Sequence, residues 1–135
     1  FNEEDDPLTM RSVEHNGHEN LTLLELVLRA QGDFRRCLEP LLVTPLQAGV
    51  ILYLQRHMGA KLTDAAAAVC VREPTLSTVV KDLVRKRWVT KRRSLTDIRA
   101  VCLALSRQAE AMARKIEAQV RLVRSDLTPI KEIRS

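Results

Sequence analysis

The stretch REPTLSTVVKDLVRKRWVTKRRSLTDIR, residues 72–99, decides the fold, because a helical period gives way to a strand period inside it. The helical part places four aliphatic residues on one face: Leu76, Val79, Val80 and Leu83. WVTKR, residues 88–92, and RAVCLAL, residues 99–105, are rich in residues that suit strands, and they flank the polar turn SLTD. The sequence therefore predicts a helix over about 73–86, followed by a β-hairpin.

Positive charge is concentrated in the same stretch. The whole chain of 135 residues carries a formal net charge of +5, whereas residues 72–99 hold nine bases and three acids, a net +6. Residues 1–20 hold six acids and one base, a net −5. An excess gathered in one segment indicates an anionic partner more strongly than the same excess spread over a surface.

Two further helices are predicted upstream. In TPLQAGVILYLQRH, residues 44–57, Thr44 suits the N-cap, Pro45 suits the first helical position and Gln47 completes a capping box. A short alanine-rich helix follows over about 63–70. Together with the helix of the quoted stretch it forms two short helices joined by a tight turn, which is a helix-turn-helix.

Long apolar stripes predict a first and a last helix. The first stripe is Leu23, Val27, Ala30, Phe34, Leu38 and Leu41, widened by Leu21, Leu24 and Leu28. The last follows a cap residue, Ser106, and has the same spacing: Leu105, Ala109, Met112, Ile116, Val120 and Val123. Leu127-Thr128-Pro129 is typical of the start of another short helix. A lone chain would struggle to cover both stripes, so we expect the terminal helices of two copies to intertwine.

A helix-turn-helix followed by a basic hairpin is the arrangement in which a helix enters the major groove of DNA and a wing reaches the backbone or the minor groove. The face of the second helix opposite the apolar residues carries Thr75, Thr78, Lys81 and Arg85, with Ser77 at its margin. Arg92 and Arg93 of the hairpin would neutralise phosphates. A merely solvated polar face is the alternative, and the neighbouring basic hairpin favours DNA contact.

Between about Val43 and Ala109 the chain resembles the MarR-type winged helix-turn-helix regulators. The resemblance rests on TPLQAGVIL, DAAAAVCVREPTLSTVVKDLVRK and WVTKRRSLTDIRAVCLALS, with Pro74-Thr75 and Asp97-x-Arg99 as the most specific parts. It implies a mainly α fold with a small β-hairpin, and a homodimeric transcriptional regulator, usually a repressor, whose first and last helices form the dimer interface. It also implies release from DNA by a small anionic or aromatic ligand, or by cysteine oxidation.

Carried over by position, the resemblance places four residues on the helix that reads the major groove: Thr75, Ser77, Thr78 and Lys81. It implies that Asp97 orders the wing through arginine pairing and that Arg99 is the minor-groove arginine. The chain departs from the family pattern at three positions. Arg87 and Cys70 stand where glycine is usual, and Ile98 replaces an arginine.

The expected organisation is an acidic, flexible head over residues 1–20, dimerisation helices over 21–42 and 104–135, and a winged helix-turn-helix DNA-binding region over 43–103. The expected function is a sequence-specific regulator that binds a palindromic operator in double-stranded DNA, a repressor released by a small organic anion. Two alternatives stay open. One is a winged-helix module that docks an acidic protein, and the other is a redox-responsive repressor that uses a cysteine.

No pattern supports catalysis, a cofactor or a metal. His15 and His18 lack a third ligand near them in the sequence, and no phosphate-binding glycine loop or nucleophile motif is present. Cys37, Cys70 and Cys102 form no CxxC pair, and a lone cysteine in an apolar pattern is usually a small core residue. No apolar run approaches the roughly 18 residues of a membrane span, and the acidic start is unlike a signal peptide. We therefore expect a soluble, cytoplasmic protein that is not an enzyme.

Overall fold

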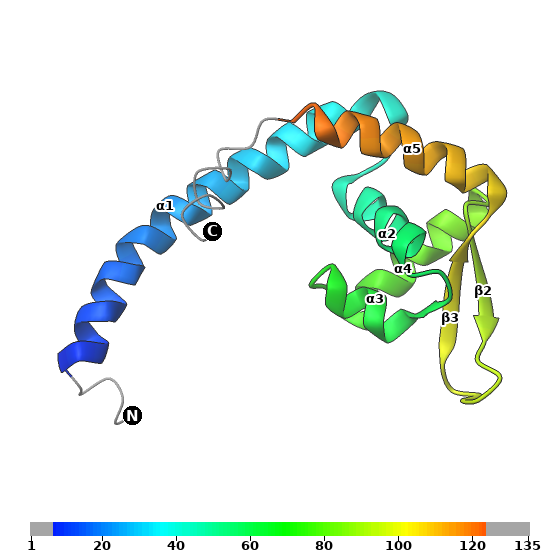
Figure 1. Ribbon diagram of the computed structural model, residues 1–135, viewed down its shortest axis with the longest axis horizontal. Helices are drawn as coiled ribbons and strands as arrows, with labels where there is room; N and C mark the ends of the chain where they lie inside the picture. The colour runs from blue at the N-terminus through cyan, green and yellow to red at the C-terminus, as the bar shows by residue number, and fades with distance from the viewer. Residues whose placement is uncertain (1–6, 124–135) are drawn as a thin grey trace. The chain divides into compact units, whose positions relative to one another are not determined.

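The computed structural model describes residues 7–123, and the side chains of residues 19–123. The elements in chain order are α1 (Pro7–Leu38), η2 (Glu39–Leu41), α2 (Pro45–Arg56), β1 (Ala60–Lys61), α3 (Leu62–Ala68), α4 (Glu73–Arg85), β2 (Val89–Arg93), β3 (Val101–Leu105) and α5 (Arg107–Arg121); Figure 1 labels all of them except η2 and β1. The mainly α fold with a small hairpin is confirmed. Residues 34–123 form one compact unit, and residues 7–33 belong to another.

The first helix begins earlier than the sequence predicts. We expected a flexible head over residues 1–20, but α1 begins at Pro7, so residues 7–20 are helical. Proline suits the first helical position, and extending a helix costs less than nucleating one. The α-helical part ends at Leu38, and a 3-10 turn leads to Leu42 in the left-handed conformation, with φ 58°. The predicted short helix at residues 127–129 lies outside the described residues.

The start of α2 confirms the predicted capping box. The Thr44 side chain accepts a hydrogen bond from the Gln47 amide at 3.1 Å, and the Gln47 side chain accepts one from the Thr44 amide at 3.0 Å. The helix behind this cap is buried in the core through Ala48, Val50, Ile51 and Leu54. Among the described residues, no single helix has the length and hydropathy to cross a bilayer. The segments 19–41 and 45–56 have the required length and hydropathy only when they are taken together, and they meet at a bend of 79°.

The sheet has three antiparallel strands in the order β1-β3-β2. The hairpin of β2 and β3 was predicted, and its register pairs Val89 with Leu105 and Arg93 with Val101. Strand β1 was not predicted: its two residues pair with the middle of β3, and the amide of Gly59 donates to the Leu103 carbonyl at 2.9 Å. Gly59 has φ 80°, a conformation that favours glycine.

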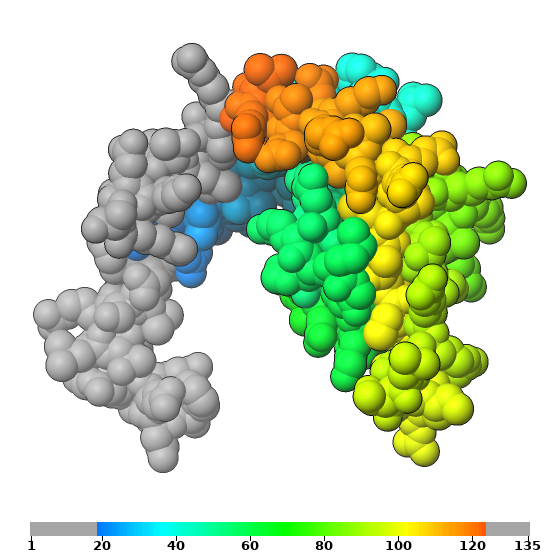
Figure 2. Space-filling model, turned by 45° about the vertical axis from the view of Figure 1, so that its right-hand side comes forward, coloured from blue at the N-terminus to red at the C-terminus, as the bar shows by residue number. Residues whose placement is uncertain are grey.

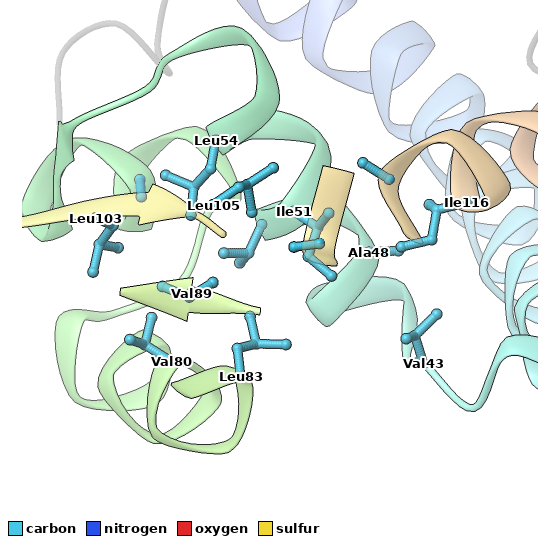
Figure 3. Close-up of a cluster of buried hydrophobic side chains, with 14 of the residues drawn as sticks. Val43, Ala48, Ile51, Leu54, Val80, Leu83, Val89, Leu103, Leu105 and Ile116 are labelled. Carbon is cyan, nitrogen blue, oxygen red and sulfur yellow. The ribbon is translucent and has the colours of Figure 1, made fainter. Parts of the chain in front are cut away.

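One apolar core joins the helices to the inner face of the sheet (Figure 3). The sheet contributes Val89, Leu103 and Leu105, α2 contributes Ile51 and Leu54, and α4 contributes Leu76, Val80 and Leu83. Burying each of these side chains stabilises the fold by ~1.5–3 kcal/mol relative to leaving it in water. The predicted inward face of α4 is therefore confirmed.

Helix α5 packs against the core, and hydrogen bonds at its two ends join it to the hairpin and to the end of α1. It begins after Ser106, whose hydroxyl oxygen accepts from the Ala109 amide at 3.2 Å, as predicted. Its stripe packs inward through Ala109, Ala113 and Ile116. Near its other end, Gln119 Nε2 donates to the Cys37 carbonyl at 2.9 Å. This bond ties the last turns of α5 to the end of α1.

Candidate DNA-binding site

The turn of the helix-turn-helix is a Schellman motif. The amide of Cys70 donates to the Ala67 carbonyl at 3.2 Å and the amide of Val71 to the Ala66 carbonyl at 3.0 Å, with Cys70 at φ 57°. This left-handed position usually holds glycine, in line with the departure noted in the sequence. Cys70 is exposed, so our interpretation of the cysteines as core residues is wrong for it, whereas Cys37 and Cys102 are half-buried.

Helix α4 presents its polar face to solvent. Thr75, Thr78, Lys81 and Arg85 are exposed and Ser77 is half-buried, which confirms the predicted division of faces. The Thr78 hydroxyl donates to the Pro74 carbonyl at 3.1 Å, so its lone pairs remain for an outside donor. Arg85 pairs with Asp82 at 3.2 Å. Within residues 19–123, the Lys81 ammonium has no hydrogen-bond or ion-pair partner, and it is free to contact a ligand.

The base of the hairpin is fixed by a second Schellman motif. Arg87 has φ 63°, its amide donates to the Val84 carbonyl at 2.9 Å, and the next amide, of Trp88, donates to Leu83 at 3.0 Å. The Ser106 hydroxyl donates to the Arg87 carbonyl at 2.7 Å, and the Ser106 amide donates to the Trp88 carbonyl at 2.9 Å. The start of β2 is thereby clamped to the start of α5.

The Lys86 ammonium is engaged by contacts within the protein. Its ammonium lies 4.8 Å from the centroid of the Trp88 ring and donates to the Leu42 carbonyl at 3.4 Å. A cation over an aromatic face is attracted by the ring quadrupole. Not every base of the 72–99 stretch is therefore equally available for phosphates.

The hairpin tip, residues 94–100, is organised by short polar side chains. The Ser94 amide donates to the Ala100 carbonyl at 2.9 Å, and the Ser94 hydroxyl oxygen accepts from the amides of Thr96 and Asp97, each at 3.2 Å. Asp97 Oδ1 accepts from the Arg99 amide at 3.0 Å. These bonds fix the turn without any glycine, and serine and aspartate are residues that favour such local bonds.

The role expected for Asp97 needs a correction. The resemblance implies arginine pairing, yet no arginine among the described residues lies within 4.0 Å of its carboxylate as an ion pair. Its carboxylate instead holds the backbone of Arg99. Arg93 NH1 donates to the Ile98 carbonyl at 3.1 Å, so an arginine does support the tip, but through the main chain.

Arg92 and Arg93 point to opposite faces of the hairpin. Residue 92 pairs with Cys102 and residue 93 with Val101, and successive side chains of a strand alternate between faces. Arg92 lies on the outer face, beside a shallow groove of about 450 Å³ lined by Met58, Gly59, Thr90, Arg92, Cys102, Leu103, Ala104 and Leu105. Arg93 lies on the face of the hairpin that is turned toward the helices, and its side chain is exposed. The two side chains therefore leave the strand on different sides of the wing.

The predicted site residues gather on two surfaces. Thr75, Thr78 and Lys81 share the exposed face of α4, and the hairpin beside this helix runs past it to a tip that projects into solvent (Figures 1 and 2). Arg99 is exposed at this tip, and its side chain has no hydrogen-bond or ion-pair partner in the part of the chain that is described. Ser94, which builds the tip, was missed, although Ser-x-x-Asp in a hairpin turn is a signal for it. Residues 19–123 hold no cluster of metal ligands.

Comparison with known proteins places this geometry in a family. Residues 43–100 match the model of the MarR family. The CouR repressor bound to a 23-mer DNA duplex is 26% identical, with a TM-score of 0.70 over 75% of this chain and 71% of that chain. No curated protein matches the chain significantly.

Two more distant structures share the fold. A mutant MarR from E. coli complexed with operator DNA is 18% identical, with a TM-score of 0.72 over 80% of this chain and 77% of that one. NadR in complex with 4-hydroxyphenylacetate is 22% identical, with a TM-score of 0.70 over 86% and 80%. The helix-turn-helix, the wing and the family match agree, and residues 43–100 form a winged helix-turn-helix region of the MarR-family type, with the fold that CouR and MarR share.

Proposed function

We propose that this protein is a sequence-specific repressor that binds a palindromic operator in double-stranded DNA as a homodimer. The observation that carries the proposal is the exposed face of α4, with its unpartnered Lys81, beside a wing that projects into solvent and is rich in exposed cations. A helix N-terminus and small hydroxyl residues suit base edges and phosphates, and cations supply the attraction that does not depend on sequence. The DNA-bound CouR and MarR structures support this assignment. Because a repressor must reach its operator, we propose that the protein acts in the cytoplasm.

The proposed residue roles follow from these surfaces. Thr75, Ser77, Thr78 and Lys81 face the major groove, and Arg99 enters the minor groove. Arg92 and Arg93 neutralise phosphates on the two sides of the wing, and Asp97 holds the main chain that carries Arg99. The winged region is residues 43–103.

The dimer is proposed from an uncovered apolar stripe. Leu21, Leu24 and Leu28 lie at helical spacing on α1 and are 64%, 53% and 54% exposed, and Leu122 after α5 is 72% exposed. Soluble monomers seldom leave such a stripe in water, and a two-fold partner covers it with the same stripe. Residues 21–42 and 104–135 are accordingly the proposed dimerisation helices. A double variant, Leu24→Ser with Leu28→Ser, should sediment as a monomer at micromolar concentration where the wild type sediments as a dimer.

The effector is proposed as a small organic anion that favours a spacing of the two wings unlike that of the operator. NadR in complex with 4-hydroxyphenylacetate, a carboxylate, supports this chemical class. A panel of aromatic and aliphatic acids tests it by melting temperature and by DNA affinity. A panel that shifts neither quantity removes the effector from the proposal and leaves DNA binding in place.

DNA binding is tested by selecting bound sequences from random duplexes and measuring affinity for the selected operator by anisotropy. Log affinity should fall linearly with log salt, with a slope of roughly −0.9 for each neutralised phosphate. Lys81→Ala should weaken binding, and Lys115→Ala, which removes an exposed cation from α5, should leave it nearly unchanged. Selection that enriches no sequence, with wild type and Lys81→Ala equal on every duplex, would contradict the proposal.

A further inference from the structure

We propose that Leu95 and Ile98 form an apolar wedge that the wing inserts into the minor groove, where it loosens the stacking of one base step. The inference rests on the proposed DNA binding and adds a contact that the cations cannot make. Leu95 is fully exposed and Ile98 is 74% exposed, and both lie within the seven-residue tip between β2 and β3. Two large aliphatic side chains at the point of a hairpin have no role in the core of this chain.

The tip holds these side chains outward. The backbone around Leu95 is fixed because the Ser94 hydroxyl accepts the two amides that follow Leu95. The peptide group that follows Ile98 is held at both of its polar atoms, because the Ile98 carbonyl accepts from Arg93 at 3.1 Å and the Arg99 amide donates to Asp97 at 3.0 Å. A wedge must be held in place before it meets the base stack, since a mobile turn would lose ordering entropy on binding.

The charges around the tip identify the partner as a polyanion. Four cations flank the two aliphatic residues, namely Lys91, Arg92, Arg93 and Arg99. The single acid of the tip, Asp97, has one carboxylate oxygen engaged by a backbone amide. An apolar protein surface would not select this ring of positive charge. The minor groove of DNA matches this arrangement, because two phosphate backbones flank a floor of sugars and base edges that can contact aliphatic side chains.

Leucine and isoleucine are among the side chains that DNA-bending proteins insert between base steps. Steps of the pyrimidine–purine type unstack most easily, so a wedge selects them without any hydrogen bond to a base. The inference therefore predicts a preference for TA or CA/TG steps under the wing, outside the bases that face α4. It also predicts an affinity term that does not depend on salt, because burying apolar surface releases no counterions.

The test uses the full chain and the operator selected with the wild type. A fluorescent adenine analogue is placed in turn at each step flanking the bases that face α4. The variant pair is Leu95→Ser with Ile98→Ser. Arg92→Ala is the control for loss of a wing cation. Urea unfolding of each variant checks that the fold is intact.

We expect the double variant to bind about tenfold more weakly at every salt concentration, with an unchanged salt slope, and to lose the fluorescence rise that the wild type causes at one step. Arg92→Ala should instead flatten the slope and keep the rise. Wild-type affinity and wild-type fluorescence in the double variant would overturn the wedge while leaving the proposed function intact. A wild type that binds no duplex would overturn both. Lost binding of the double variant to anionic vesicles, with DNA binding unchanged, would reassign the tip to a membrane surface.

Discussion

Asp97 Oδ1 holds the backbone amide of Arg99 at 3.0 Å, so the one acid at the tip of the wing shapes the turn that presents an arginine. If charge alone mattered, removing this acid would strengthen binding to DNA. We expect Asp97→Ala to weaken operator binding, because the turn loosens and Arg99 loses its orientation. Asp97→Asn keeps an acceptor for the amide and removes the charge, so it should bind at least as tightly as the wild type. Tighter binding by both variants, measured by anisotropy at fixed salt, would show that the wing acts only as a diffuse basic patch.

Arg99→Ala should weaken operator binding and flatten the dependence of log affinity on log salt by about one unit, because one cation fewer displaces counterions from the duplex. The base preference in the major groove should survive, since α4 is untouched. Affinity at four or more salt concentrations measures the slope. An unchanged slope would remove Arg99 from the interface.

Lys81→Ala and Thr78→Val should instead change which bases are preferred. Both residues lie on the exposed face of α4, and a good contact to a base edge discriminates by ~1–3 kcal/mol. Thr78→Val also removes the 3.1 Å bond to the Pro74 carbonyl, so thermal melting must accompany the binding assay. Repeating the selection with each variant should give a relaxed consensus at one or two positions. The wild-type consensus at lower affinity would assign Lys81 to phosphate alone.

Cys70→Gly should stabilise the fold by about 1 kcal/mol, because a non-glycine residue pays for the left-handed conformation that the Schellman motif requires. Arg87→Gly, at φ 63°, should act in the same direction. Ala67→Gly is the matched control in α3, where helical backbone should make glycine destabilising by roughly 0.5–1 kcal/mol. Urea unfolding measures all three variants. Destabilisation by Cys70→Gly would mean that its side chain makes a contact which outweighs the backbone.

Ser106→Ala should lower the free energy of unfolding by about 1–2 kcal/mol, because the N-cap of α5 and the bond to the Arg87 carbonyl are lost together. Ser106→Thr keeps the hydroxyl and should recover most of the loss. Fluorescence of Trp88, beside the clamp, follows the transition. A Ser106→Ala variant as stable as the wild type would show that water replaces both bonds.

The features that the sequence predicts well are those fixed by neighbours along the chain. The Thr44 capping box, the two faces of α4 and the hairpin all follow from local spacing. Strand β1 does not, because its two residues carry no period and their partners, Leu103 and Cys102, lie far along the chain. The early start of α1 was missed because residues 7–20 lack an apolar stripe.

The sequence predicts which residues carry the positive charge of the site, but it does not predict how their side chains are oriented or what they contact. Composition could identify the cations of the wing, but not that Arg92 and Arg93 point apart or that Lys86 is held by Trp88. The partner of Asp97 depends on the path of seven tip residues, which a pattern of charges does not determine. Exposure of Leu95 and Ile98 also emerged only with the fold, because aliphatic residues beside a strand are equally compatible with a core.

Helix α5 has a mechanical consequence. Ser106 clamps its first turn to the base of the wing, and Gln119 fastens its last turns to the end of α1. Its 15 residues make a rigid rod of about 22 Å. A tilt of about 10° at the Gln119 end would displace the base of the wing by roughly 4 Å over such a length. If a ligand or a partner tilts α5 at the Gln119 end, the helix would act as a lever that moves the base of the wing without deforming the wing.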